Sequence, residues 1–207
     1  MTRWDYSLGK SMKKIILATR NLDKIREIRA IMSSLPLEIE SLEKFSDVPE
    51  VIEDGLTLEE NALKKARQIF QATRLPALSD DTGLEVFSLG LQPGVMSARY
   101  AGSSATYEDN CRKLLRALAS VPPSDRRARF RCVSVFTDGT IEKIAEGICH
   151  GTIIEEPRGN GGFGYDPIFV PDGYHQTFAE LPAEIKNRIS HRAKAFRRMT
   201  EILKESF

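Results

Sequence analysis

Residues 127–150 read RARFRCVSVFTDGTIEKIAEGICH, and this stretch decides the fold class. Two segments rich in apolar residues, 127–136 and 141–150, flank the tetrapeptide Thr-Asp-Gly-Thr. Asp-Gly between two such segments indicates a β-hairpin, because both residues accept the backbone angles of a tight hairpin turn. The stretch therefore predicts two long antiparallel strands.

Strand and helix patterns alternate before the hairpin. Short segments at 15–18 and 37–42 indicate strands. Between them, Ile25, Ile28 and Met32 recur at the spacing of one helix face. Alternation of this kind is typical of a sheet with helices packed against it.

Two further helices carry recognisable N-terminal signals. Thr57 and Glu60 match a capping box, and apolar residues at helical spacing follow, which predicts a helix over 58–72. Thr106 is the expected cap of another helix over 107–119.

After the hairpin, the sequence predicts a short strand at 168–170, stopped by Pro171, and a final helix over 191–204. Early alternation followed by a hairpin predicts an α/β fold, with a mixed sheet flanked by helices. We expect two lobes with a ligand cleft between them. Residues 13–207 should form this single two-lobed domain, and residues 1–12 a polar N-terminal extension.

Composition excludes several classes of protein. A chain of 207 residues is long enough for one large domain, and a net charge of +1 argues against a dedicated nucleic-acid surface. No apolar stretch approaches the ~20 residues of a membrane span, and the N-terminus lacks the apolar segment of a signal peptide. The three cysteines show no CxxC spacing, which favours a reduced, cytoplasmic setting with structural thiols.

Two adjacent acids stand out in residues 78–84, LSDDTGL. Apolar residues flank Asp80 and Asp81 on both sides, so their carboxylates need a cationic partner, and a divalent metal is one candidate. The alternative is a tight turn in which Gly83 takes positive φ. Successive residues of an extended strand point to opposite faces, so both acids can ligate one metal only where the backbone turns sharply. Glu53, in a loop before the predicted helix 58–72, is a second candidate ligand.

Residues 19–24, TRNLDK, lie between a predicted strand and a predicted helix. The free amides of a helix N-terminus bind anions readily, and Thr19 and Asn21 can add hydrogen bonds while Arg20 and Lys24 add charge. The alternative is a capped turn with solvated basic residues. The segment is not a P-loop, because GxxxxGK[ST] is absent.

A glycine-rich loop follows the hairpin at 159–167, GNGGFGYDP. Its glycines allow close approach of a ligand to the backbone, and Phe163 and Tyr165 are suited to stacking on a base. The alternative is a loop whose rings pack into the core. Further along, Lys186 and the sequence Ser-His-Arg at 190–192 gather polar groups near a helix start, where they could bind phosphate or the polar edge of a base. An N-cap followed by exposed cations is the simpler reading of 190–192.

Taken together, these segments resemble the inosine triphosphate pyrophosphatase family over about residues 14–204. The resemblance rests on Thr19-x-Asn21-x-x-Lys24, Glu53, Thr57-Leu58-x-Glu60-Asn61-Ala62, residues 79–84, residues 93–100, residues 162–167 and residues 190–192. Arg20 departs from the small residue often found at its position, which leaves its role open.

The resemblance implies a two-lobed fold around a long central sheet, usually a homodimer. It implies cleavage of ITP, dITP and XTP between the α and β phosphates, giving the nucleoside monophosphate and pyrophosphate. By motif match, Asp81 would be the catalytic acidic residue and a ligand of Mg²⁺, for which Mn²⁺ can substitute, and Glu53 the second metal ligand. Asp80 is expected to support the site or the turn. The expected substrate contacts are Thr19, Arg20, Asn21, Leu22, Asp23, Lys24, Thr82, Phe163, Gly164, Tyr165, Asp166, Lys186, His191 and Arg192.

Two other functions fit parts of the pattern. A pyrophosphatase with a pyrimidine preference, as in the Maf-like proteins, would use the same phosphate and metal apparatus. A nucleotide sensor or single-strand nucleic-acid-binding protein could use Phe163 and Tyr165 as stacking platforms. The near-neutral charge and the acids at 80–81 count against this last possibility.

Overall fold

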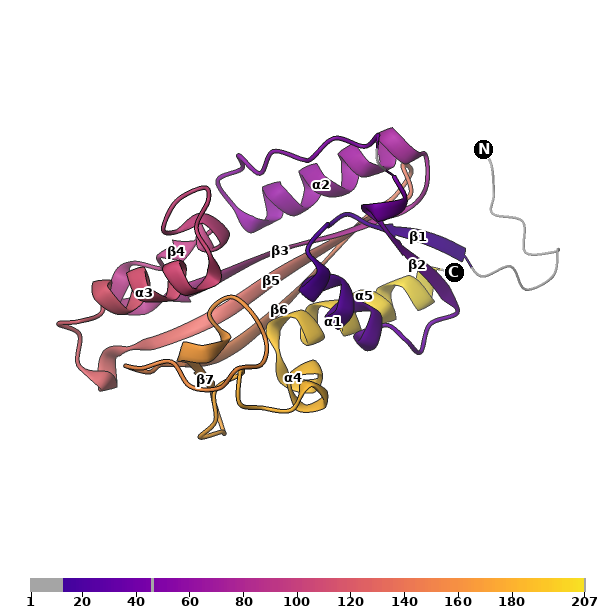
Figure 1. Ribbon diagram of the computed structural model, residues 1–207. Coiled ribbons are helices and arrows are strands. Elements are labelled where there is room, and N and C mark those ends of the chain that lie inside the picture. Colours follow the sequence, from indigo (N-terminus) through magenta and orange to yellow (C-terminus); the bar gives the residue numbers. More distant parts are fainter. Residues whose placement is uncertain (1–12, 46, 207) are drawn as a thin grey trace.

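The computed structural model describes residues 13–45 and 47–206, so the predicted extension 1–12 lies outside the described residues. Its centre is one mixed sheet with the strand order β2-β1-β3-β5-β6-β7, and β4 pairs with β3 outside this path (Figure 1). The strands are β1 (Lys13–Leu17), β2 (Leu37–Ser41), β3 (Ala77–Val86), β4 (Pro93–Gly94), β5 (Arg127–Thr137), β6 (Glu142–Ile153) and β7 (Phe169–Pro171). The predicted α/β class with a mixed sheet is confirmed.

The hairpin of β5 and β6 is the longest pairing in the sheet and confirms the prediction from residues 127–150. Its register runs from Arg127 opposite Thr152 to Thr137 opposite Glu142. In the turn, Gly139 has a φ of 85°. Asp138 Oδ1 accepts hydrogen bonds from the backbone N–H groups of Thr140 and Ile141. The residues of the turn and the apolar pattern of the two strands therefore both favour the observed pairing of β5 with β6.

Strand β3 runs unbroken through residues 77–86, parallel to β1 and antiparallel to β5. The alternative of a tight turn at the two acids is therefore wrong. Gly83 is extended and serves another purpose, since a Cβ on it would lie 2.6 Å from the carbonyl oxygen of Gly94. Glycine at this position lets the short strand β4 approach the backbone of β3.

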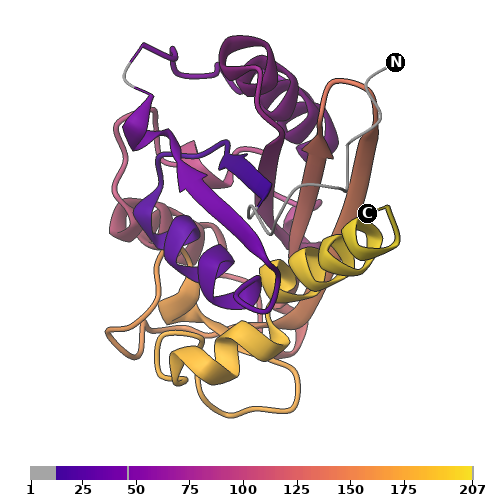
Figure 2. The same cartoon turned by 90° about the vertical axis from the view of Figure 1, so that its right-hand side faces the viewer.

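In the described part of the chain, five α-helices accompany the sheet: α1 (Leu22–Ile31), α2 (Leu58–Thr73), α3 (Tyr107–Ala117), α4 (Ala183–Ile189) and α5 (His191–Ser206). Helix α2 covers one face of the sheet, and α1 and α5 lie on the other (Figures 1 and 2). Thr106 and Asp109 form a complete capping box on α3. At α2, the Thr57 hydroxyl accepts a hydrogen bond from the Glu60 N–H, as predicted. The Glu60 carboxylate, however, accepts from the N–H of Leu56 and not from that of Thr57, so the second hydrogen bond of the predicted capping box is shifted by one residue.

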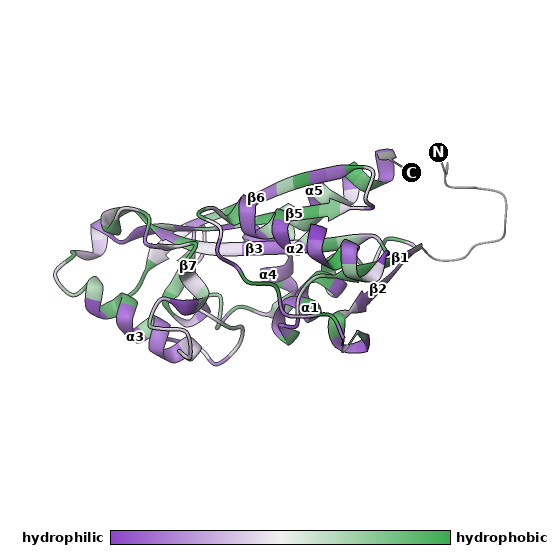
Figure 3. Ribbon diagram, turned by 90° about the horizontal axis from the view of Figure 1, so that it is seen from above, coloured by the Kyte–Doolittle hydropathy of each residue, from purple (hydrophilic) through white to green (hydrophobic). Residues whose placement is uncertain are grey.

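The apolar residues form separate clusters on the two faces and at one end of the sheet. Hydrophobic and hydrophilic residues alternate along α5 (Figure 3), whose buried stripe of Ala195, Phe196, Met199 and Leu203 packs with α1 against the sheet. Smaller clusters lie under α2. A further cluster surrounds Phe130 and joins α3 to the segment after β6.

Two further observations bear on the class of protein. No helix among the described residues is long and apolar enough to cross a membrane. Cys111, Cys132 and Cys149 are all free and buried, and burial raises the pKa of the Cys132 thiol to about 12. Because the thiolate is the reactive form, burial and a raised pKa make such a thiol less reactive.

Candidate active site

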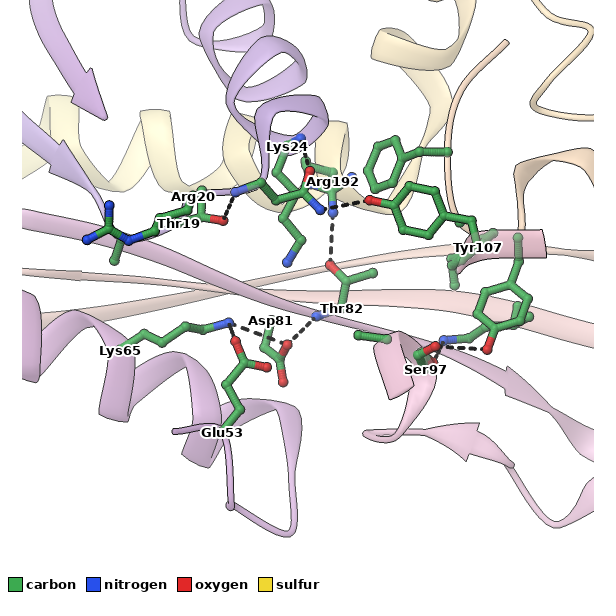
Figure 4. A pocket seen from close by; sticks show the side chains of 18 of the residues that line it. Thr19, Arg20, Lys24, Glu53, Lys65, Asp81, Thr82, Ser97, Tyr107 and Arg192 are labelled. Carbon is green, nitrogen blue, oxygen red and sulfur yellow. Dashed lines mark hydrogen bonds and ion pairs between the residues drawn. The ribbon is translucent and has the colours of Figure 1, made fainter. Parts of the chain in front are cut away.

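One cavity of about 290 Å³ brings the predicted motifs together (Figure 4). It lies where the loop after β1, the loop before α2, strand β3, the glycine-rich loop and the start of α5 meet. The predicted residues that line it are Thr19, Arg20, Asn21, Lys24, Glu53, Asp81, Thr82, Phe163, Gly164, Tyr165, Asp166, Lys186, His191 and Arg192. Leu22 and Asp23 do not line it. Leu22 is 59% exposed, and the Asp23 side chain pairs with Arg26 on the surface of α1.

Asp80 and Asp81 contact different elements on opposite faces of β3, as their adjacent positions in an extended strand require. Asp80 contacts Lys24 of α1 and Arg192 of α5. Asp81 contacts Asn61 and Lys65 of α2. The two acids therefore do not share one ion, and each has a separate task.

The Asp80 side chain is fully buried among cations. Its Oδ2 lies 3.1 Å from Lys24 Nζ and 3.3 Å from Arg192 Nη2, and it accepts a hydrogen bond from the Thr82 hydroxyl. Burial alone would raise the pKa of Asp80, but the charges of Lys24 and Arg192 outweigh it and hold the pKa well below its usual range. Asp80 is thus permanently ionised, and its charge holds two cavity-lining cations in place.

Asp81 faces the cavity in a different environment. Its Oδ1 accepts from the backbone N–H of Thr82 at 3.0 Å, and its Oδ2 accepts from Asn61 Nδ2 at 3.2 Å. Burial raises the pKa of Asp81, and the negative charge of Glu53 adds to the rise, while Lys65 opposes it. A carboxylate with a raised pKa is a better proton acceptor than an exposed one.

Lys65 of α2 was missed by sequence reasoning, although it is central to this face. Its Nζ lies 2.7 Å from Glu53 Oε1 and 3.5 Å from Asp81 Oδ1, so both carboxylates converge on one ammonium (Figure 4). Burial lowers the pKa of Lys65, but the charges of Asp81 and Glu53 outweigh it and raise the pKa. Asn61 and Lys65 lie one turn apart on the buried face of α2. Two polar residues at positions of an otherwise apolar helix face were the feature of the sequence that could have indicated a functional role for Lys65.

The loop between β1 and α1 forms a capped helix start at the edge of the cavity. Asn21 caps α1, since its Oδ1 accepts from the N–H groups of Asp23 and Lys24 at 3.0 and 3.1 Å. Thr19 Oγ1 accepts from the Asn21 N–H. Arg20, whose role the sequence left open, donates to the carbonyl oxygens of residues 42 and 48 and so ties this loop to the segment that leads to Glu53.

The two aromatic residues of the glycine-rich loop differ in burial. Phe163 is half-buried beside the cavity, with Lys186 Nζ 4.8 Å and the Arg192 guanidinium 5.4 Å from its ring centroid. Tyr165 is only 4% exposed, belongs to the apolar cluster around Phe130 and donates to the Ser97 carbonyl. The prediction of two exposed stacking platforms is therefore wrong for Tyr165, where packing into the core prevails.

The two cations that come after the glycine-rich loop in the sequence, Lys186 and Arg192, line the cavity and are buried. Lys186 contacts both Asp166 and Glu27, and Arg192 contacts Glu27 at 2.7 Å from the side opposite Asp80. Arg192 is 1% exposed, so the reading of 190–192 as a cap with exposed cations is wrong for this residue. Glu27 was also missed, because nothing local in the sequence marks it as the partner of residues more than 150 positions away.

His191 is a neutral group in this wall. It is 3% exposed and stacks on Phe130, with ring centroids 4.6 Å apart. Burial, together with the positive charges of Arg192 and Lys186, lowers the pKa of His191 well below its usual value. His191 Nδ1 and Arg192 Nε are buried and have no hydrogen-bond partner among the described residues. Because buried polar atoms are normally hydrogen-bonded, these two nitrogens are candidates for hydrogen bonds to a ligand.

Comparison with known proteins decides the family. The sequence model of the Ham1 family matches residues 15–202. The chain belongs to the Ham1 family. One Ham1 relative, named dITP/XTP pyrophosphatase, comes from Geobacter sulfurreducens and is 51% identical over 185 residues, covering 89% of this chain and 93% of the relative. Another of the same name, from Geobacillus kaustophilus, is 46% identical over 191 residues, covering 92% and 94%.

A solved structure of a Ham1 protein supports the same assignment. The HAM1 protein from Coxiella burnetii aligns with a TM-score of 0.85 and 41% identity, covering 94% of this chain and all of that one. The resemblance that these sequence motifs carry is therefore confirmed at the level of the family and its fold.

Proposed function

We propose that this Ham1 chain hydrolyses deaminated purine nucleoside triphosphates (ITP, dITP and XTP) to the nucleoside monophosphate and pyrophosphate. The observation that carries the proposal is the convergence of Asp81 and Glu53 in a cavity lined also by a helix N-terminus and an aromatic ring. The names of the relatives from Geobacter and Geobacillus support the same substrate class.

The cavity offers distinct places for the parts of a nucleotide. The N-terminus of α1, with Lys24 beside it, suits the phosphates, since its amides and dipole favour negative charge. Phe163 suits a base, because its ring lies at the cavity wall within reach of two cations. Asp81 and Lys65 lie on the α2 side of the same cavity, where we place the bond to be cleaved.

The residues present fit a bound Mg²⁺. Glu53 and Asp81 already converge on the Lys65 ammonium, so their carboxylates can also meet on a metal ion. No group of three or more acidic, histidine or cysteine side chains suited to a metal occurs among the described residues. Two carboxylates completed by substrate oxygens and water are the usual ligand set of Mg²⁺. When bound, the ion would neutralise phosphate charge and lower the pKa of a nearby water, and Mn²⁺ could replace it.

In the proposed reaction, water attacks the α phosphorus and the bond from that phosphorus to the α–β bridging oxygen breaks. The Asp81 carboxylate accepts the proton of the water, and the leaving group departs as pyrophosphate. Lys24 and Lys65 donate hydrogen bonds to the phosphate oxygens, each worth ~1.5–3 kcal/mol net for a charged pair. Asn61 and the Thr82 amide hold the Asp81 carboxylate in position.

Base selection follows from the donors of the cavity wall. Hypoxanthine and xanthine present a 6-oxo acceptor where adenine presents an amino donor. Arg192 Nε, which has no hydrogen-bond partner among the described residues, is a donor that can pair with the oxo group and is left unpaired by adenine. Mismatches of this kind give discrimination on the order of 10⁴ in favourable cases.

A panel of nucleoside triphosphates tests the substrate class. With Mg²⁺, we expect kcat/KM for dITP and XTP to exceed that for ATP, dTTP and UTP by at least about 100-fold, since a site with fixed donors rejects bases that leave them unpaired. A higher kcat/KM for dTTP or UTP would instead show the pyrimidine preference of a Maf-like enzyme. Salt-dependent binding of oligonucleotides without hydrolysis would show a nucleic-acid-binding protein.

We further propose that the clusters beside α5 and around Phe130 are the cores of two lobes within one domain over 13–207, and that the cavity is the cleft between them. Leu84 and Phe130 of the second cluster line the cavity, and so do Lys24 and Arg192 of the two helices that pack in the first, which supports this division. The homodimer and the cytoplasmic location stay predictions from the resemblance and the composition.

A further inference from the structure

We propose that Tyr107 binds a sugar hydroxyl of the nucleotide, an inference that rests on the proposed function. Tyr107 is the first residue of α3 and lines the cavity beside the α1 terminus. Its side chain projects toward the loop 19–24 (Figure 4), and its hydroxyl accepts a hydrogen bond from Asn21 Nδ2 at 3.0 Å. None of the motifs that indicate the family includes this residue.

The hydroxyl of Tyr107 keeps a proton to donate. Asn21 is fixed by its cap, because its Oδ1 accepts from two backbone N–H groups and its Nδ2 must then be the donor to Tyr107. A phenol that accepts from an amide still has its own O–H for another acceptor. No other hydrogen bond of the Tyr107 hydroxyl occurs among residues 13–45 and 47–206, and the side chain is 43% exposed.

The position of Tyr107 between two other contacts identifies the sugar as its target. On one side the hydroxyl meets the cap of the phosphate-binding loop. On the other side the ring of Tyr107 lies 5.8 Å from that of Phe163, centroid to centroid, where we place the base. A nucleotide whose phosphates meet the loop and whose base meets Phe163 has its sugar beside Tyr107. A neutral phenol is suited to a neutral sugar hydroxyl, since cations already serve the phosphates.

The test compares two substrates in two proteins. The wild type and Tyr107→Phe are assayed with dITP and with 2′,3′-dideoxyinosine triphosphate, which lacks sugar hydroxyls. We expect Tyr107→Phe to lower kcat/KM for dITP about tenfold, the upper range for one neutral hydrogen bond. For the dideoxy substrate we expect no change within about twofold, because the partner of the phenol is already gone.

The outcomes separate sugar binding from a structural role. An equal loss on both substrates would show that Tyr107 only holds Asn21 and the loop, and would overturn the proposal, as would no loss on either. Tyr100→Phe is the matched control, because this phenol lies outside the cavity lining, and it should leave both values unchanged. Failure of the wild type to hydrolyse dITP would contradict the proposed function itself, and the sugar assignment would fall with it.

Discussion

Asp81→Asn is expected to lower kcat for dITP by at least about 10³-fold, within the range that positioned proton acceptors contribute. The amide keeps the shape of the side chain and can accept from either Asn61 or the Thr82 N–H, but not from both. It neither accepts a proton nor brings negative charge to a metal. Asp81 faces the cavity, its pKa is raised by burial, and it shares a cation with Glu53. The measurement is the steady-state release of pyrophosphate at saturating Mg²⁺.

Asp54→Asn is the control for this variant. Asp54 is exposed, pairs with Lys64 and follows Glu53 in the chain, but it does not line the cavity. We expect its kcat to stay within about twofold of the wild type, since exposed ion pairs contribute little. If Asp81→Asn keeps the circular dichroism spectrum and the kcat of the wild type, Asp81 has no part in the reaction.

Asp80→Asn is expected to lower the free energy of unfolding by about 3–5 kcal/mol, the usual cost of removing one partner from a buried ion pair. The Asp80 side chain is fully buried, and it compensates Lys24 and Arg192, of which Arg192 is also buried. An asparagine has nearly the same volume but leaves these cations without a negative charge on this side. The measurement is chemical denaturation at pH 7, where Asp80 is ionised in the native state.

The matched control is Asp172→Asn. Asp172 also forms an ion pair with an arginine, Arg127, but the side chain is 52% exposed to solvent. Its loss should cost about 0–1 kcal/mol, as for other exposed pairs. Equal effects of the two substitutions would show that the Asp80 pairs do not stabilise the fold.

Much of the fold follows from local patterns in the sequence. The Asp-Gly turn and its flanking strands predict the β5–β6 hairpin, and the caps at Thr57 and Thr106 predict the starts of α2 and α3. Each of these signals acts between residues close in the chain, so the sequence alone contains it. Helix α4 was missed, because its seven residues after Pro182 are too few for a recognisable helical pattern, although Ile185 and Ile189 pack on the cluster around Phe130. The predicted end of α3 at residue 119 lies two residues beyond the observed one, an ordinary difference at a helix end.

The site was predictable where a motif marks it and not where partners meet across the fold. The alternation of side chains along a strand already separated Asp80 from Asp81, and the structure gives each its own set of cations. The contacts of Glu27 with Lys186 and Arg192, and of Lys65 with Glu53, join elements that only the folded sheet brings together. Burial of Tyr165 likewise depends on the cluster around Phe130, which has no local signature.

The most direct measurement of the central claim is the stoichiometry of products from dITP with Mg²⁺. If water attacks the α phosphorus in this cavity, each dIMP formed is accompanied by one pyrophosphate and no orthophosphate. Chromatography of the nucleotide and an assay that distinguishes pyrophosphate from orthophosphate give this ratio in one experiment. Release of orthophosphate with formation of dIDP, or no hydrolysis of dITP, would contradict the account.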